Sequence, residues 1–206
     1  MEDLKRISLI ISFSLFLSCF QLLSQPSTQA AFAKSYEAEQ AGNYTKAITE
    51  LKRIYKADSY FVNIRLGWLY YLDKQYTVSI QYYNIAIALK PYAIEAKFGC
   101  VKPLSALGNW DKVKEQYFRI LKVDHQNTVA NYWLGVIYYN RKDYINAAKL
   151  FEKVVNLYPL DYDSVIMLAW TKLNLGSFAD AKVLFNHSLN IRPNDSSALS
   201  GLKQLK

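Results

Sequence analysis

The sequence predicts an all-α fold built from about five stacked helix-turn-helix repeats. The main observation is a unit that recurs every 34 residues, so that Leu134-Gly135 is answered by Leu168-Ala169 and Phe151 by Phe185. Within each unit the apolar residues follow helical spacing, and turn-forming residues separate two helical stretches. A fixed period of this length is typical of stacked repeat proteins, because a single unit cannot bury its own apolar surface.

The unit boundaries follow from this period. The clearest unit has Leu134 and Ile137 on its first helix, and Ala147 and Phe151 on its second. A capping helix is expected after the last unit, over residues 196–206. The five units are expected at residues 28–59, 60–93, 94–127, 128–161 and 162–195.

Turns and small residues explain how each helix pair closes. Proline cannot continue a helix, and it is expected to end three second helices, at Pro91, Pro159 and Pro193. The aromatic residue after each turn is expected to fill the space between neighbouring units. Small residues are expected to let the paired helices approach, with Gly67, Gly135 and Ala169 near Ser79, Ala147 and Ala181. The turns are expected at Gly42-Asn43, Gly108-Asn109, Lys142-Asp143 and Gly176-Ser177.

This pattern resembles the tetratricopeptide repeat family over nearly all of the chain after the N-terminal leader. The resemblance implies antiparallel helix pairs in a right-handed superhelix, whose first helices line a concave face that usually binds a peptide or partner helix. The chain departs from the family where Pro103 stands inside a first helix, and a kink or a late helix start is expected there. It also departs where the family favours tryptophan, at Asn63, Lys97, Asn131 and Val165.

The resemblance implies a partner-binding groove lined by aromatic residues, with Asn140 and Asn174 beside it. Related chaperone-binding modules hold a peptide carboxylate with lysines and asparagines at these positions, where this chain offers only Lys102, Asn140 and Asn174, so such a carboxylate clamp is not expected. An aromatic groove suits an apolar or extended peptide, or an amphipathic helix. Packing between adjacent first helices is the alternative explanation for any one of these residues. The implied groove residues are Tyr36, Trp68, Tyr71, Phe98, Lys102, Tyr132, Tyr139 and Trp170.

Residues 1–30 are interpreted as a leader rather than part of the repeats. A short charged start precedes the apolar run Ile7–Leu23, and small residues follow, as in a secretory signal peptide. Cleavage after Ala30 is favoured. The run is long enough to remain as a membrane anchor, and lipidation of Cys19 is a further alternative. The chain is therefore expected to be exported, to the periplasm or cell envelope of a bacterium.

The composition narrows the class of partner. The net charge is +8, but no long basic run appears, so the lysines are interpreted mainly as solvated outer faces of second helices. Contact with anionic lipid or an acidic partner is the alternative. Nucleic acid is not expected to bind an exported protein. Of the two cysteines, Cys100 is expected to be a small buried hydrophobe.

No catalytic, cofactor or metal motif stands out in the sequence. His125 and His187 lie far apart in the repeat scheme, and neither has ligands at metal-binding spacing. The chain is therefore expected to be a non-enzymatic protein–protein interaction scaffold that needs no cofactor. Two alternatives remain: a glycan-binding or enzyme-accessory carrier module, and a self-associating structural array.

Overall fold

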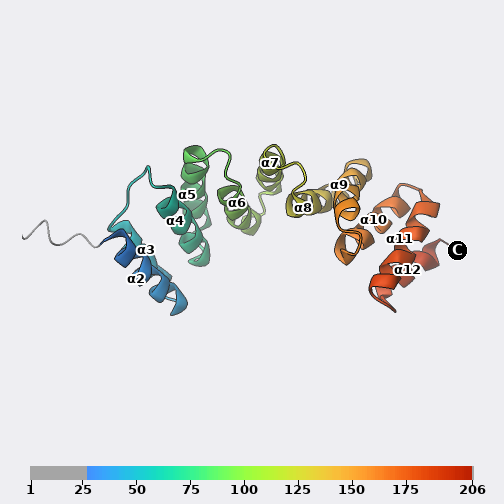
Figure 1. Ribbon diagram of the computed structural model, residues 1–206, viewed down its shortest axis with the longest axis horizontal. Coiled ribbons are helices and arrows are strands. Elements are labelled where there is room, and N and C mark those ends of the chain that lie inside the picture. The colour runs from blue at the N-terminus through green and yellow to red at the C-terminus, as the bar shows by residue number, and fades with distance from the viewer. Residues whose placement is uncertain (1–26, 206) are drawn as a thin grey trace, which may run out of the picture. The chain divides into compact units, whose positions relative to one another are not determined.

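The computed structural model describes residues 27–205 (Figure 1). These residues fold into two compact units that divide between Leu89 and Lys90. Eleven helices and no strand occur within these residues, which confirms the predicted all-helical repeat fold. The leader residues before Ser27, including Cys19, lie outside the described part.

The first compact unit, which ends at Leu89, contains two helix pairs, that is, two repeats. The pairs are α2 (Thr28–Gln40) with α3 (Tyr44–Lys52), and α4 (Tyr60–Leu72) with α5 (Tyr76–Leu89). Leu51, Leu66 and Leu69 are completely buried where α3 meets α4. Each pair thus covers apolar surface that its neighbour exposes.

The second compact unit, which begins at Lys90, contains three helix pairs and a final helix. Consecutive helices pack against one another, and α12 also touches α10. Phe151 and Phe185 are completely buried in the second helices of the last two pairs. The helices are α6 (Glu95–Ala106), α7 (Trp110–Leu121), α8 (Thr128–Asn140), α9 (Tyr144–Leu157), α10 (Tyr162–Asn174), α11 (Phe178–Ile191) and α12 (Ser196–Gln204).

A single left-handed residue turns the chain within every repeat. Between α8 and α9 this residue is Lys142, with φ 61°. Its N–H donates to Tyr139 O and that of Asp143 donates to Tyr138 O, which is the hydrogen-bond pattern of a Schellman motif. The Asp143 carboxylate then caps α9 through the N–H of Asn146, at 3.2 Å. The equivalent left-handed residues are Gly42, Lys74, Gly108 and Gly176.

Buried polar residues at the family's tryptophan position hold the loops between repeats. Asn131 is fully buried, and its Nδ2 donates to the carbonyl oxygens of His125 and Asn127 at 3.1 and 2.9 Å. Asn63 makes the same pair of contacts with its own loop, and Lys97 Nζ does so at 2.6 Å to each carbonyl. Burial lowers the pKa of Lys97, with a smaller contribution from Arg119. These departures from the family pattern are therefore structural.

The small first-helix residues do pack closely against the second helices. Ser79 Oγ donates to the carbonyl of Gly67 at 2.6 Å. At Gly135, however, the closest neighbour is the ring of Phe151, which would lie 2.8 Å from an added Cβ. The close approach that the sequence predicts is therefore present, but an aromatic ring fills the contact at Gly135.

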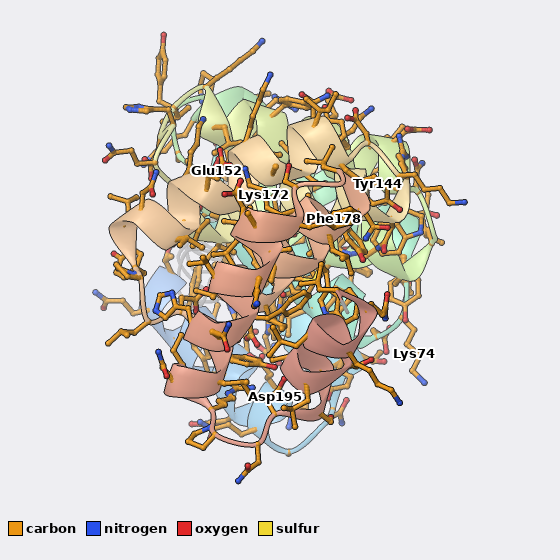
Figure 2. The ribbon with its side chains drawn as sticks, turned by 90° about the vertical axis from the view of Figure 1, so that its right-hand side faces the viewer. Lys74, Tyr144, Glu152, Lys172, Phe178 and Asp195 are labelled. Carbon is orange, nitrogen blue, oxygen red and sulfur yellow. The ribbon has the colours of Figure 1, made fainter. Side chains whose placement is uncertain are left out.

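The expectation for the aromatic after each turn is wrong at two positions. Trp110 and Phe178 are 52% and 59% exposed, so neither side chain fills the space between neighbouring repeats. Tyr144 instead packs edge-on against Tyr139, with ring centroids 5.4 Å apart. Figure 2 labels Tyr144 and Phe178.

Of the two alternatives expected near Pro103, a kink or a late helix start, the late start is wrong. α6 begins at Glu95 and continues through Pro103 to Ala106. Pro103 is buried in the last turn, where its missing N–H costs one hydrogen bond without stopping the helix. Leu107 and Asn109 then close the helix end by donating to Pro103 O and Leu104 O.

Candidate partner-binding groove

One face of α8 carries an unusual run of accessible apolar side chains. Val129, Tyr132, Trp133 and Val136 recur at intervals of one to four residues and end at Asn140, so they share one side of the helix. The Trp133 side chain is 48% exposed. We call the two cavities that meet along this face the α8 groove.

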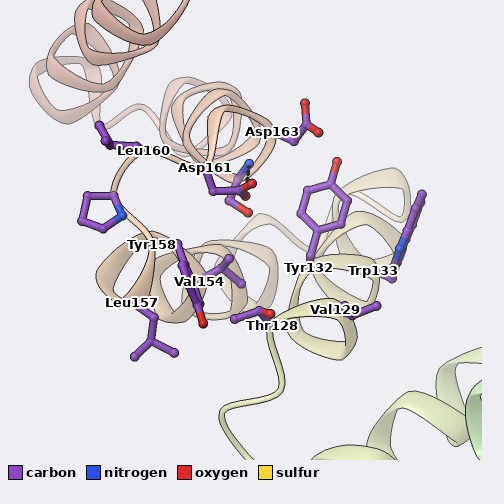
Figure 3. Close-up of a pocket in the computed structure, with 12 residues that line it drawn as sticks. Thr128, Val129, Tyr132, Trp133, Val154, Leu157, Tyr158, Leu160, Asp161 and Asp163 are labelled. Carbon is purple, nitrogen blue, oxygen red and sulfur yellow. Dashed lines mark hydrogen bonds between the residues drawn. The ribbon is translucent and has the colours of Figure 1, made fainter. Parts of the chain in front are cut away.

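The first cavity lies between the start of α8, the end of α9 and the loop that leads to α10 (Figure 3). Its volume is about 680 Å³. Leu160 on the loop is 75% exposed, and Pro159 keeps the loop from continuing α9. The cavity is lined by Thr128, Val129, Tyr132, Trp133, Val154, Leu157, Tyr158, Pro159, Leu160, Asp161, Asp163 and Ser164.

The second cavity lies on the other side of Trp133, between α8, α7 and the end of α6. Its volume is about 570 Å³. Arg141 lines it and pairs with Asp111 at 2.9 Å, which lowers the pKa of that carboxyl. The lining residues are Ser105, Trp110, Val113, Tyr117, Trp133, Val136, Ile137, Asn140 and Arg141.

The polar groups that line the first cavity include a tyrosine hydroxyl and a carboxylate that caps a helix. Burial raises the pKa of Tyr132, with further contributions from Asp163 and Asp161, so its hydroxyl stays protonated at neutral pH. The Asp161 carboxylate already caps α10 by accepting from the N–H of Ser164 at 3.1 Å (Figure 3). Across residues 27–205 no group of three or more His, Cys, Asp or Glu could hold a metal ion, and no helix is long and apolar enough to cross a membrane.

Sequence comparison decides the family. Two tetratricopeptide repeat models match the chain, one over residues 27–94 and the other over residues 138–205, and together they span more than half of it. The chain belongs to the tetratricopeptide repeat family. Proteins of this family are generally protein–protein interaction scaffolds. No curated protein is detectably similar in sequence.

Solved structures of tetratricopeptide repeat proteins share the fold. The crystal structure of MamA is 17% identical with a TM-score of 0.69, over 80% of this chain and 91% of MamA. A tetratricopeptide repeat protein from Parabacteroides merdae is 19% identical with a TM-score of 0.72, over 86% and 71%. YrrB, described as having an unusual peptide-binding site, is 13% identical with a TM-score of 0.70, over 91% and 97%. At these identities the likeness concerns the fold alone.

In the first unit of this tetratricopeptide repeat protein, three of the predicted groove residues lie beside an ion pair. Arg65 pairs with Glu39 at 2.5 Å, and its guanidinium lies 3.9 Å from the centroid of the Tyr36 ring. Trp68 Nε1 donates to the same Glu39 carboxylate, and Tyr71 lies 5.7 Å from the Trp68 ring. Tyr36, Trp68 and Tyr71 therefore form one aromatic cluster around the contact between α2 and α4.

In the second unit, two of the predicted groove residues contact each other. Asn174 Nδ2 donates to the hydroxyl of Tyr139 at 3.3 Å, which partly offsets the burial that raises the pKa of Tyr139. Trp170 packs edge-on against Phe185, and its Nε1 donates to Ser197 on α12. Trp170 thus contributes to the docking of the last helix.

The remaining predicted residues divide between the α8 groove and other surfaces. Tyr132 lines the first cavity and Asn140 lines the second. Phe98 packs against Tyr117 with ring centroids 6.4 Å apart, and Lys102 is exposed on α6. Neither Phe98 nor Lys102 lines a cavity of the α8 groove.

Sequence reasoning did not select Trp110 and Trp133, which both line the second cavity. Trp110 follows a turn and was expected to be a packing residue, and Trp133 stands one position after Tyr132 in the repeat register. A tryptophan on each of two consecutive helices, at a place where the other repeats have none, was the available signal.

Proposed function

We propose that this protein is an exported, non-enzymatic scaffold that binds an extended peptide or a partner helix in the α8 groove. The observation that carries the proposal is the position of Trp133, which is half exposed and borders both cavities. Monomeric proteins rarely leave large contiguous apolar surfaces exposed unless these bind something. Tryptophan is also the residue type most often found to dominate interface energetics.

The size and polarity of the α8 groove support a peptide ligand. Two cavities of about 680 and 570 Å³ fall within the range of ordinary ligand pockets. Exposed Leu160 and Tyr158 on one side, and Trp110 on the other, would contact apolar side chains of the ligand. Asn140 and Arg141 would supply hydrogen bonds that fix its direction.

Peptide selection tests this proposal even while the natural partner is unidentified. A displayed peptide library is selected on the chain that contains residues 27–206, and the Kd of the selected peptide is measured by fluorescence anisotropy. Trp133→Ala should weaken binding at least about tenfold. Phe178→Ala is the matched control, because Phe178 is similarly exposed but lies outside the cavities, and it should change Kd by less than about twofold.

The same reagents separate the alternatives. Equal Kd values for folded Trp133→Ala and the parent chain would remove the α8 groove as the binding site. Binding to a glycan array that depends on Trp133 would favour the carrier module, since aromatic faces also stack on sugars. Sedimentation of the purified chain tests the self-associating array.

Export is the second part of the proposal, and it rests on the apolar leader. Expression of the full chain in a bacterium, followed by fractionation and intact mass measurement, distinguishes its forms. A mass that corresponds to residues 31–206 supports cleavage after Ala30, and a diacylglycerol-modified product that begins at Cys19 supports lipidation. Full-length protein in the membrane fraction supports an anchor, and full-length protein in the cytoplasm contradicts export.

A further inference from the structure

We propose that a second groove, between α7 and α9, binds an acidic amphipathic segment of a partner protein. This α7–α9 groove has a volume of about 370 Å³ and lies on the opposite side of α8 from the second cavity of the α8 groove. It is lined by Phe118, Leu121, Lys122, Leu134, Tyr138, Asn146, Lys149, Leu150 and Lys153.

The floor of this groove is apolar. Leu134 on α8 is 1% exposed, and the rings of Phe118 and Tyr138 meet edge to face with centroids 6.4 Å apart. Leu121 and Leu150 come from the helices on either side. A ligand must therefore present apolar side chains to this floor to release the water above it.

The rim of the groove is basic. Lys149 and Lys153 stand one helical turn apart on α9, and Lys122 faces the groove from the end of α7. All three are exposed, and no acidic residue is among those that line the groove. The Asp143 carboxylate, next to Asn146, already accepts two hydrogen bonds from that residue, one from the backbone N–H that caps α9 and one from Nδ2. Carboxylates on either side of an apolar ligand stripe would complement these lysines.

The next repeat provides an internal comparison. In the 34-residue register, Phe118 corresponds to Glu152 and Tyr138 to Lys172. Glu152 and Lys172 pair at 2.7 Å, and Figure 2 labels them next to each other. Lys172 also lies 3.9 Å from Asp180. In the next repeat an ion pair therefore joins α9 and α10 at these positions, whereas the equivalent positions in the α7–α9 groove carry aromatic rings.

The same register shows that the basic rim is particular to this groove. The positions of Lys149 and Lys153 are occupied by Val183 and His187 one repeat later. Lysines at these positions are therefore not repeated in the next second helix, as they would be if they only kept the outer face of each repeat solvated.

A peptide fits this groove better than a membrane surface does. Insertion into a bilayer requires apolar side chains that protrude beyond the charged ones. Here Leu134 is recessed beneath exposed lysines. A narrow ligand with its own apolar ridge can reach the floor, but a flat lipid surface cannot.

The test uses a labelled synthetic amphipathic peptide of about 14 residues, roughly four helical turns, with leucines on one face and glutamates beside them. Its Kd for the chain of residues 27–206 is measured by anisotropy. Lys122→Glu, Lys149→Glu and Lys153→Glu together should weaken binding at least about tenfold. The matched control changes three exposed lysines elsewhere, Lys34, Lys46 and Lys182, to Glu and should cost less than about threefold.

A second variant tests the floor without changing net charge. Phe118→Glu with Tyr138→Lys copies the ion pair of the next repeat into this groove and keeps all three rim lysines. It should also weaken binding at least about tenfold, with an unchanged helical circular dichroism spectrum. Trp133→Ala should leave this peptide's Kd unchanged, which separates the proposal from that for the α8 groove.

Several results would overturn the proposal. These are no binding of the glutamate peptide to the parent chain, equal losses in the two triple-lysine variants, or full binding by the floor variant. Equal binding of a peptide with lysine in place of glutamate would remove the charge argument. Binding to phosphatidylglycerol vesicles that depends on the three rim lysines would assign the groove to lipid instead.

Discussion

The ring of Phe151 lies so close to Gly135 that a Cβ added at the glycine would be 2.8 Å from Cε1 of the ring. Phe151 is completely buried, so the ring cannot move toward solvent to make room. The absence of a side chain at Gly135 therefore allows α8 and α9 to pack around the Phe151 ring. Gly67 packs against Tyr83 in the same way, and a Cβ added at Gly67 would lie 3.0 Å from the Tyr83 ring.

Gly135→Ala should lower the free energy of unfolding by about 1 kcal/mol, although alanine is the better helix former. Gly135→Leu should cost about 1–3 kcal/mol or more, because overpacking then extends beyond one carbon. Urea denaturation followed by circular dichroism measures both values. An unchanged midpoint for Gly135→Leu would show that the helices separate easily at this point.

A double-mutant cycle attributes the loss to the ring. Phe151→Leu alone should destabilise the protein through a cavity. In the Phe151→Leu background, Gly135→Ala should cost less than it does alone, because the clashing atoms are gone. Additive losses would place the strain elsewhere.

Lys142→Gly should stabilise the protein by about 0.5–1 kcal/mol. Lys142 adopts φ 61°, a left-handed conformation that costs a residue with a Cβ roughly 1–2 kcal/mol, and glycine regains part of this after its greater freedom in the unfolded chain is counted. Thermal denaturation of the variant checks the direction. Gly176→Ala makes the opposite change at the equivalent turn and should destabilise, since φ there is 75°. A stabilised Gly176→Ala would refute the argument.

The fold could be predicted because its determinants are local and repeated. Helix starts, turn residues such as Gly108-Asn109, and terminal prolines all recur with one period, so each unit confirms the others. The sequence predicts a turn at Lys142-Asp143, but the left-handed conformation of Lys74 and Lys142 could not be recognised from residue type. The surrounding helix pair imposes that conformation against the preference of lysine.

The site was less predictable because exposure depends on the space between helices. Trp110 and Trp133 line a cavity only because the end of α6 leaves the side of α8 accessible, and no local pattern reports that spacing. The role of Asn131 was also hidden, since its partners are main-chain carbonyls rather than side chains. The residues mapped from the family resemblance remain predictions.

A chain that begins at Ala31 should be less stable than one that begins at Ser27, by about 1 kcal/mol. Ser27 caps α2 through the N–H of Ala30 at 3.2 Å, and Ala31 is completely buried. A new α-amino group at Ala31 would also place positive charge at the helix start, which the helix dipole disfavours. Thermal denaturation of both chains measures the difference. Ser27→Ala in the longer chain isolates the cap, and equal stability of all three would contradict its importance.

Tyr117→Phe should reduce the loss of stability at alkaline pH. Burial raises the pKa of Tyr117 to about 12, so its neutral form is favoured in the folded state. The stability that the neutral Tyr117 hydroxyl contributes is fully present below the unfolded pKa near 10 and is lost as the pH rises toward 12. The loss in the free energy of unfolding is on the order of 2 kcal/mol in total. Urea denaturation of both proteins at pH values between 9 and 12 measures it. The stability of the parent chain relative to Tyr117→Phe should fall as the pH rises, whereas the titration of other groups is common to both proteins and cancels. A constant difference would mean that Tyr117 ionises normally.

Trp68 and Tyr139, which the family resemblance implies as groove residues, lie outside the α8 groove; if the partner also contacts them, Trp68→Ala and Tyr139→Ala should each weaken its affinity by at least about 1 kcal/mol. Large rings bury much area with few rotatable bonds, and both side chains remain partly exposed beside other aromatic rings. The measurement is the Kd of the peptide selected on residues 27–206, with thermal stability as the control. Trp170 requires a milder change, because it packs on Phe185 and holds Ser197 of α12. Trp170→Phe keeps a ring there, and a loss of affinity without a loss of stability would assign it to the groove. Folded Trp68→Ala and Tyr139→Ala variants with unchanged Kd would instead confine binding to the α8 groove around Trp133.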